Sequence, residues 1–236
     1  MSDSLPSDRH PPARFNAARY CLAENARLRP GKTALIMVGD DTADRLTFGD
    51  VERAVRGIAA GLLGLGLKPS DRVMIRMGNE ADYVLVYFGA LAAGLVALPS
   101  SPQLTEGEAA FLMENFGAAA VVVGSGCTVS PEALGDRLLL DAGAITALKA
   151  GPPLPDYADT AADDPAVLIY TSGTTSRPKG VLHAHRAAYG RRPMLVHWLG
   201  LSESDVMLHA GTMNWTYTLG VVLSDPWSVG ATAVLY

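Results

Sequence analysis

A short run of small and hydroxyl-bearing residues directly follows a predicted apolar strand at residues 166–170. The run consists of Thr171, Ser172, Gly173, Thr174, Thr175 and Ser176, and Arg177, Pro178, Lys179 and Gly180 come next. Small residues let backbone N–H groups approach an anion, and a concave series of such groups binds phosphate oxygens. The hydroxyl groups add rotatable donors, and Lys179 adds a positive charge. These residue types predict a loop that binds a polyphosphate.

The spacing of this loop separates the phosphate interpretation from two others. A flexible Ser/Thr/Gly linker is disfavoured because the loop leaves a predicted buried strand directly and Pro178 limits its freedom. A Walker A loop needs a glycine, four residues and then Gly-Lys-Ser/Thr. Here Gly180 follows Lys179, and no glycine directly precedes that lysine. The spacing therefore excludes a Walker A loop.

Two histidines, His183 and His185, follow the loop one residue apart. Histidine is a common zinc ligand, but no cysteine or carboxylate nearby in the sequence completes a ligand set. We therefore expect no zinc site and no metal ligands from the chain. Instead, His185 is predicted to begin a helix that continues through Leu199.

Alternating strands and helices must position the loop. Apolar runs predict strands at residues 33–38, 45–47, 72–77, 95–98, 119–123 and 166–170. Helical spacing predicts helices at 51–63 and 80–93, and a third helix that has Ala109, Leu112, Met113 and Phe116 on one face. Thr47 with Asp50 and Thr105 with Glu108 form capping boxes, which mark helix starts. Residues 141–165 contain four prolines and are predicted to be a surface connection. Continuous apolar strands between helices predict an α/β fold of wound, mostly parallel sheets flanked by helices.

Composition excludes several classes of protein. The 236 residues are 49% hydrophobic and 18% charged, which excludes a disordered chain, and the net charge of −5 argues against binding to nucleic acid. Two cysteines are too few for a disulfide framework, and the N-terminus has no secretory signal, so we expect a cytoplasmic protein. The apolar stretch 83–98 is short for a membrane span and is interrupted by glycines.

The loop sequence TSGTTSRPKG, residues 171–180, resembles the signature of the adenylate-forming (AMP-binding) superfamily. This superfamily includes acyl-CoA synthetases, aryl-CoA ligases, luciferases and peptide-synthetase adenylation domains. The resemblance extends over residues 33–236. One position departs from the pattern, because Ser176 stands where the family usually has glycine. Serine pays a penalty at positive φ that glycine does not, so the loop geometry at this position is open.

The resemblance implies a two-step activation of a carboxylic acid. The carboxylate attacks the α-phosphate of ATP to give an acyl-adenylate and pyrophosphate, and a thiol, often that of coenzyme A, then displaces AMP. Mg²⁺ would bridge phosphate oxygens. By resemblance, the β- and γ-phosphates are bound by the residues from Thr171 to Ser176, with Thr174 and Lys179 in catalytic roles. The alternative for Lys179 is a solvated surface lysine.

The resemblance also places the pocket for the carboxylic acid. In the family, residues after the strand that corresponds to the one near Met207 line this pocket, which makes Asn214, Trp215 and Tyr217 the candidates. The alternative is that Trp215 and Tyr217 are core aromatics. The segments around Trp215 and Trp227 resemble those of medium-chain acyl- or aryl-CoA ligases more than those of peptide-synthetase domains.

The resemblance finally predicts the domain layout. Residues 1–30 would form an N-terminal tail and first helix, and residues 31–236 part of the large N-terminal AMP-binding domain, without the C-terminal half and the small domain. We therefore expect little adenylation activity from this chain alone. Alternatives are an adenylation domain serving a carrier protein, a non-catalytic nucleotide-binding module, and a γ-phosphoryl transferase that would release ADP. Homodimers are common in the family, so the oligomeric state is open.

Overall fold

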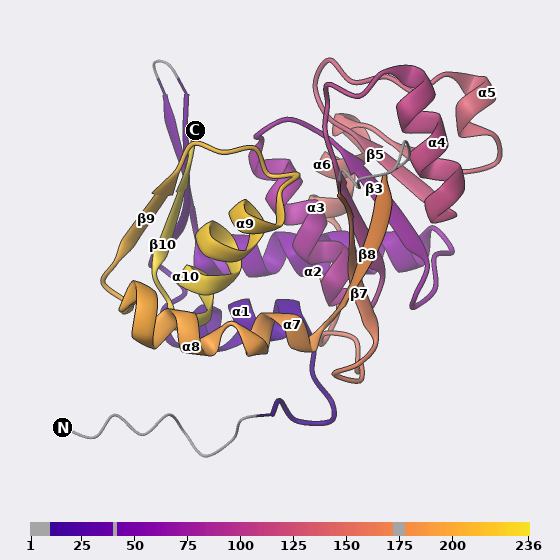
Figure 1. The fold of residues 1–236 in the computed structure, drawn as a ribbon. Helices are drawn as coiled ribbons and strands as arrows, with labels where there is room; N and C mark the ends of the chain where they lie inside the picture. Colours follow the sequence, from indigo (N-terminus) through magenta and orange to yellow (C-terminus); the bar gives the residue numbers. More distant parts are fainter. Residues whose placement is uncertain (1–9, 40–41, 172–177) are drawn as a thin grey trace.

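Two β-sheets with helices between and around them organise the chain in the computed structural model, which describes residues 10–39, 42–171 and 178–236 (Figure 1). The first sheet has the strand order β6-β5-β3-β4-β7-β8, and the second has the order β2-β1-β10-β9. The strands are β1 Thr33–Val38, β2 Ala43–Thr47, β3 Arg72–Arg76, β4 Val96–Ser100, β5 Ala120–Val123, β6 Leu138–Leu140, β7 Pro165–Thr171, β8 Lys179–Ala184, β9 Val206–His209 and β10 Thr232–Leu235.

Most neighbouring strands run parallel. Only the β7–β8 and β1–β2 pairs are antiparallel among the described strand pairs, and all other neighbours are parallel. Parallel strands need helical crossovers, which cover both faces of the sheet and keep its strands apolar. The predicted α/β fold of wound, mostly parallel sheets flanked by helices is therefore confirmed, and each predicted strand corresponds to a strand in the structure.

Long amphipathic or apolar helices fill the space around the sheets. The main helices are α1 Ala17–Leu28, α2 Phe48–Gly64, α3 Ala81–Ala92 and α4 Glu106–Phe116. Both predicted capping boxes are confirmed. The Thr47 hydroxyl accepts a hydrogen bond from the Asp50 N–H at 3.1 Å, and the Asp50 carboxylate accepts one from the Thr47 N–H at 3.1 Å. Thr105 and Glu108 form the same reciprocal pair.

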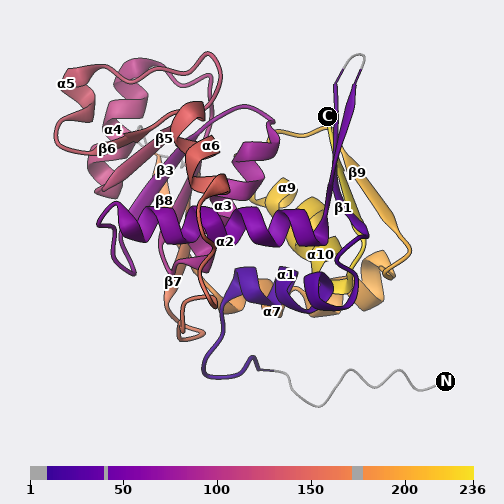
Figure 2. The same cartoon turned by 180° about the vertical axis from the view of Figure 1, so that it is seen from behind.

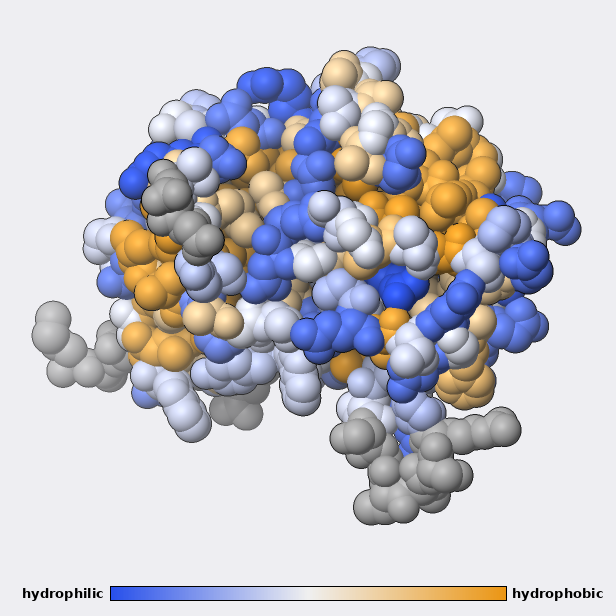
Figure 3. Space-filling model, turned by 90° about the horizontal axis from the view of Figure 1, so that it is seen from above, coloured by the Kyte–Doolittle hydropathy of each residue, from blue (hydrophilic) through white to orange (hydrophobic). Residues whose placement is uncertain are grey.

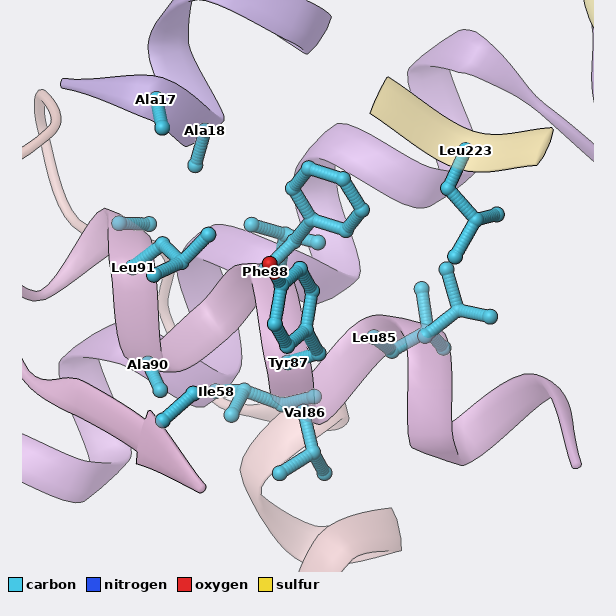
Figure 4. Packing of buried hydrophobic residues seen from close by; sticks show 14 of the residues in the cluster. Ala17, Ala18, Ile58, Leu85, Val86, Tyr87, Phe88, Ala90, Leu91 and Leu223 are labelled. Atoms are coloured by element: carbon cyan, nitrogen blue, oxygen red, sulfur yellow. The ribbon is translucent and has the colours of Figure 1, made fainter. Parts of the chain in front are cut away.

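Helix α3 lies at the centre of the larger core. Every residue from Tyr83 to Ala92 is buried. Figure 4 shows Phe88 of α3 facing Ala18 of α1, with Leu223 nearby. A helix that is apolar all round is buried in a protein interior or crosses a membrane. Among the described residues, no helix combines the length and the apolar character that a membrane crossing requires.

The segment 141–165 differs from its prediction as a surface connection. It begins with the helix α6 Ala142–Ala150, whose N-cap Asp141 accepts a hydrogen bond from the Ala144 N–H at 2.9 Å. Seen from behind, α6 lies against α2 (Figure 2). Gly57 and Gly61 of α2 permit this approach, because a Cβ atom at either position would lie within 3 Å of Leu148. The prolines affect only the part of the segment after α6.

The helix predicted from His185 to Leu199 is divided into shorter pieces. These are α7 Arg186–Gly190, α8 Arg192–Met194 and a π-helical turn, η1 Leu195–Leu199. His185, the predicted first residue, is instead the N-cap of α7, which begins one residue later at Arg186. Pro193 lies in the first turn of α8, where its missing N–H costs no hydrogen bond. A proline in mid-helix would break the ladder, which explains why one continuous helix does not form.

Candidate functional site

The described residues on either side of the predicted phosphate loop form a β-hairpin. Strand β7 runs parallel to β4 and antiparallel to β8, and Thr171 lies opposite Lys179. The Thr171 hydroxyl donates to the Lys179 carbonyl oxygen at 3.4 Å. Both residues are exposed. Ser172, Gly173, Thr174, Thr175 and Ser176 lie outside the described residues, so their predicted contacts with phosphate remain predictions.

The position of this hairpin favours a binding role. The loop begins at the carboxyl end of β7, which is the same edge at which the parallel strands β3 and β4 end. Ligands of open α/β sheets bind beyond the carboxyl ends of the strands. Figure 3 shows the molecule from above, with hydrophobic areas on both sides of a more polar middle band. Lys179 forms no ion pair with any carboxylate among the residues that the structure describes, and its predicted role at the phosphates stays a prediction.

The segment after β9 is held in place by residues at the start of α3. Asn79 donates to the carbonyl oxygens of Gly211 at 3.1 Å and Tyr236 at 2.9 Å, and its own amide oxygen accepts from the Met213 N–H at 3.1 Å. The Tyr83 hydroxyl donates to the Met213 carbonyl oxygen at 3.2 Å. Asn79 was missed at the sequence level. Its position three residues after a strand, at the carboxyl edge, is the signal that could have revealed it.

The two aromatic candidates of this segment are not core residues. Trp215 is 65% exposed and Tyr217 is 61% exposed. The Tyr217 ring lies 5.7 Å from the ring of His209, measured between centroids. Asn214 is half-buried between the anchored Met213 and Trp215. The alternative interpretation, that these two rings belong to the core of this chain, is therefore wrong. Their predicted contact with the carboxylic acid stays a prediction.

A cleft of about 260 Å³ lies behind this segment. Helix α3, strands β7 and β8 and helix α7 form part of its walls. The remaining wall comes from the short helix α9 Thr216–Thr218 and the π-helical turn η2 Leu219–Ser224 that follows it. The lining includes Leu91, Val167, Ala184, Ala188, Thr216 and Gly220. Thr216 therefore joins the segment of candidate residues to this cleft.

His185 lies at the edge of the same cleft and is fully buried. Its Nδ1 accepts a hydrogen bond from the Ala17 N–H at 3.1 Å, while its Nε2 has no hydrogen-bond partner within residues 10–39, 42–171 and 178–236. Burial lowers the pKa of His185 to about 4, because the charged imidazolium loses its contact with water. The negative charge of Asp164 has the opposite, smaller effect and raises the pKa. The imidazole is therefore neutral at pH 7 and carries its proton on Nε2. Among the described residues, no three His, Cys, Asp or Glu side chains gather as a metal site.

The family model and the related sequences assign this chain to the same family. A family model described as "AMP-binding enzyme" matches residues 22–236. The chain is 30% identical to a 4-hydroxybenzoate–CoA/benzoate–CoA ligase of Rhodopseudomonas palustris, over 94% of this chain and 43% of the relative. It is 32% identical to a benzoate–CoA ligase of Thauera aromatica, over 95% of this chain and 44% of the relative. The chain thus spans less than half the length of these relatives.

Solved structures show the same relationship. An anthranilate CoA ligase in complex with anthranoyl-AMP matches with a TM-score of 0.87 and 26% identity, over 96% of this chain and 46% of that chain. A benzoate CoA ligase from Burkholderia xenovorans matches with a TM-score of 0.82 and 31% identity, over 94% and 45%. A nonribosomal peptide synthetase matches with a TM-score of 0.80 and 26% identity, over 96% of this chain and 23% of that chain.

Proposed function

Because the chain belongs to the AMP-binding enzyme family, we propose that the whole protein is an ATP-dependent acid–thiol ligase. In the first step, the carboxylate of an acid attacks the α-phosphate of ATP, which releases pyrophosphate and forms an acyl-adenylate. In the second step, the thiol of coenzyme A attacks the acyl carbon, and AMP leaves. The observation that carries the proposal is the family match across β7 and β8, the strands that flank the loop TSGTTSRPKG.

The first step brings an anion to a polyanion, so catalysis has to come from positioning and from neutralisation of charge. We assign the β- and γ-phosphates to the loop from Thr171 to Ser176. Thr174 donates to a phosphate oxygen that becomes part of pyrophosphate, and Lys179 places its ammonium group beside the same charge. The exposure of Lys179 beside the end of β7 supports this assignment.

The site is suited to a metal ion that arrives with the nucleotide. Mg²⁺ usually keeps several waters and binds through substrate phosphates with one or two protein ligands. The described residues provide no cluster of acidic or histidine ligands, whereas Thr171 provides an exposed hydroxyl at the end of β7. Mg²⁺, held by phosphate oxygens and water, would supply charge neutralisation at the phosphates.

The acid itself would contact Asn214, Trp215 and Tyr217. The exposed rings of Trp215 and Tyr217 offer flat apolar surfaces with polar tips. Asn79 and Tyr83 fix the backbone at Met213, two residues before Trp215. The relatives named for benzoate and anthranilate support an aryl acid as substrate. We further propose that the protein works in the cytoplasm, since both cysteines are free.

A second candidate is an adenylation domain that transfers its acyl group to a carrier protein. The structural match to a nonribosomal peptide synthetase favours this candidate. The first step is the same in both cases, and only the acceptor thiol differs. Free coenzyme A therefore distinguishes the two proposals.

The test uses the protein at its full natural length, with ATP, Mg²⁺ and a panel of carboxylic acids. We expect acid-dependent release of AMP and pyrophosphate, and a thioester when coenzyme A is present. AMP release without a thioester would favour the carrier-protein candidate. Release of ADP, or no acid-dependent nucleotide cleavage with any acid of the panel, would contradict the ligase proposal.

A further inference from the structure

The end of β7, where the predicted phosphate loop begins, has few attachments to the rest of the sheet. The registered pairing of β7 with β4 is at Val167 and Ala97, four residues before Thr171. From Ile169 to Thr171, the described part of the chain pairs β7 with β8 alone, and β8 is the edge strand of the six-stranded sheet (Figure 1). Neighbouring strands on both sides therefore do not fix Thr171 and its partner Lys179.

Tyr170 provides an attachment at this point. Its hydroxyl group donates a hydrogen bond to Asn115 Oδ1 at 2.5 Å, and Asn115 lies in the last turn of α4. The ring of Tyr170 packs against the cluster of buried residues that α4 shares with β3, β4 and β5. Burial raises the pKa of Tyr170, and the positive charge of Arg72 has the opposite, smaller effect. The hydroxyl group therefore keeps its proton at neutral pH and remains a donor.

The end of α4 that carries Asn115 is itself anchored. Leu112, Met113 and Phe116 of this helix are buried. The guanidinium group of Arg72 in β3 donates to the Phe116 carbonyl oxygen, and its Cζ atom lies 5.6 Å from the centroid of the Phe116 ring. Asn115 therefore connects the end of β7 to a helix end that β3 holds in place.

Packing between α4 and the β7–β8 hairpin is incomplete. A cavity of about 240 Å³ has Asn115 and Phe116 of α4, Leu168 and Tyr170 of β7, and Leu182 of β8 in its lining. Protein interiors are normally close-packed, and this packing fixes neighbouring elements relative to each other. Where a cavity replaces packed side chains, a hydrogen bond between two lining residues contributes a larger share of the attachment.

The hydrogen bond between Tyr170 and Asn115 thus joins the anchored end of α4 to the start of the proposed phosphate site. We propose that Asn115 is a positioning residue for ATP, which acts through Tyr170 to fix the backbone at Thr171 and at its partner Lys179. Groups that are held in place before a ligand arrives lose less freedom on binding. The inference rests on the proposed function and adds a residue of α4 that acts without touching the nucleotide.

The first test is Asn115→Ala in the full-length protein, with the two half-reactions measured separately. We expect the KM for ATP in adenylate formation to rise about 3- to 10-fold, the size expected for the loss of one hydrogen bond. Transfer of the acyl group from a supplied acyl-adenylate to coenzyme A should keep its rate, because pyrophosphate has left by then. A variant that only lowered the fraction of folded enzyme would reduce both rates and leave the KM for ATP unchanged.

A second variant, Tyr170→Phe, removes the donor and keeps the ring. It should raise the KM for ATP by the same factor, and the double variant should resemble either single variant because all three lose the same hydrogen bond. The matched control is Tyr157→Phe, which removes a tyrosine hydroxyl that donates to the Glu52 carboxylate of α2 at 3.4 Å. This control should change neither the KM for ATP nor the rate of either half-reaction.

An unchanged KM for ATP in both Asn115→Ala and Tyr170→Phe would overturn the inference, and so would equal slowing of the two half-reactions. A double variant whose KM rises by the product of the two single effects would mean that the residues act independently, which also contradicts the inference. These outcomes leave the ligase proposal intact. Absence of acid-dependent AMP release by the unmodified protein would instead contradict the proposed function.

Discussion

Hydroxyl groups of the loop after Tyr170 carry the contacts that we propose for the departing pyrophosphate. In the full-length protein, Thr174→Ala should slow adenylate formation by about 10- to 100-fold, because a hydrogen bond to a charged group contributes roughly 1.5–3 kcal/mol. Transfer from a supplied acyl-adenylate to coenzyme A should change little, since pyrophosphate has left by then. Single-turnover measurement of each step checks this.

The control for this prediction is Thr146→Ala, which removes an exposed hydroxyl on α6 and should leave both steps unchanged. Equal slowing of both steps by Thr174→Ala would argue against a contact with the phosphates that leave. The loop motif could be identified from sequence because its residues are contiguous. Asn79 could not be identified in the same way, because its partners Gly211 and Met213 are more than 130 positions away along the chain.

His185 couples folding to pH. Its pKa is about 4 in the folded protein, against an ordinary value of 6.5. Well above pH 6.5, the imidazole is neutral in both the folded and the unfolded protein. In that range the residue adds no pH dependence to the free energy of unfolding. As the pH falls from 6.5 to 4, the unfolded chain binds a proton that the folded protein does not, so stability decreases by about 3 kcal/mol.

Urea unfolding between pH 7.5 and 4.5 measures this loss. His185→Gln should flatten the pH dependence relative to the unmodified protein, while the exposed His197→Gln should retain it. The comparison between the two variants removes the contribution of carboxyl groups that titrate in the same range. An identical pH dependence in all three proteins would mean that His185 is not buried in its neutral form.

Helix packing between α2 and α6 depends on glycines in α2. A Cβ atom at Gly57 would lie 2.9 Å from the Leu148 carbonyl oxygen, and backbone atoms cannot move aside cheaply. Gly57→Ala should therefore destabilise the protein by about 1–3 kcal/mol despite the better helix propensity of alanine. Gly64→Ala, at the end of the same helix with no atom nearby, should be neutral or slightly stabilising.

Chemical denaturation of both variants checks the prediction, and a stabilised Gly57→Ala protein would contradict the close approach of α6. The same contact explains why sequence reasoning found α2 and missed α6. The start of α2 is encoded locally by Thr47 and Asp50, whereas α6 has only Ile145 fully buried and rests on a surface that two distant glycines create. Local sequence patterns such as a capping box predict individual helices. A helix without such a pattern, like α6, forms because of packing against residues that are distant in the sequence.

The order of strands across the whole molecule brings together parts of the site that are far apart in sequence. Strand β10 pairs with β1, nearly 200 residues earlier, and β7 lies beside β4. Fold class follows from the alternation of apolar strands and helices, which the sequence shows directly. The cleft cannot be predicted in this way. Its walls come from α3, β7, β8, α7 and η2, which are brought together only in the folded protein.

Strand β9 forms one edge of the second sheet and presents apolar side chains there. Val206 is 64% exposed and Leu208 is 63% exposed. Unpaired edge strands with apolar faces tend to pair with other chains. A polypeptide of residues 1–236 alone should therefore self-associate at micromolar concentration, with a sedimentation profile that shifts to larger species as concentration rises.

Leu208→Lys should reduce this association, because a lysine on an edge strand opposes pairing by its charge and solvation. The matched control is Leu28→Lys, which places the same charge at an exposed position at the end of α1 rather than on a sheet edge. Sedimentation velocity of both variants at several concentrations separates the effect of position from that of net charge. Since each variant gains one positive charge, an equal decrease in association would assign the effect to net charge and not to the β9 edge.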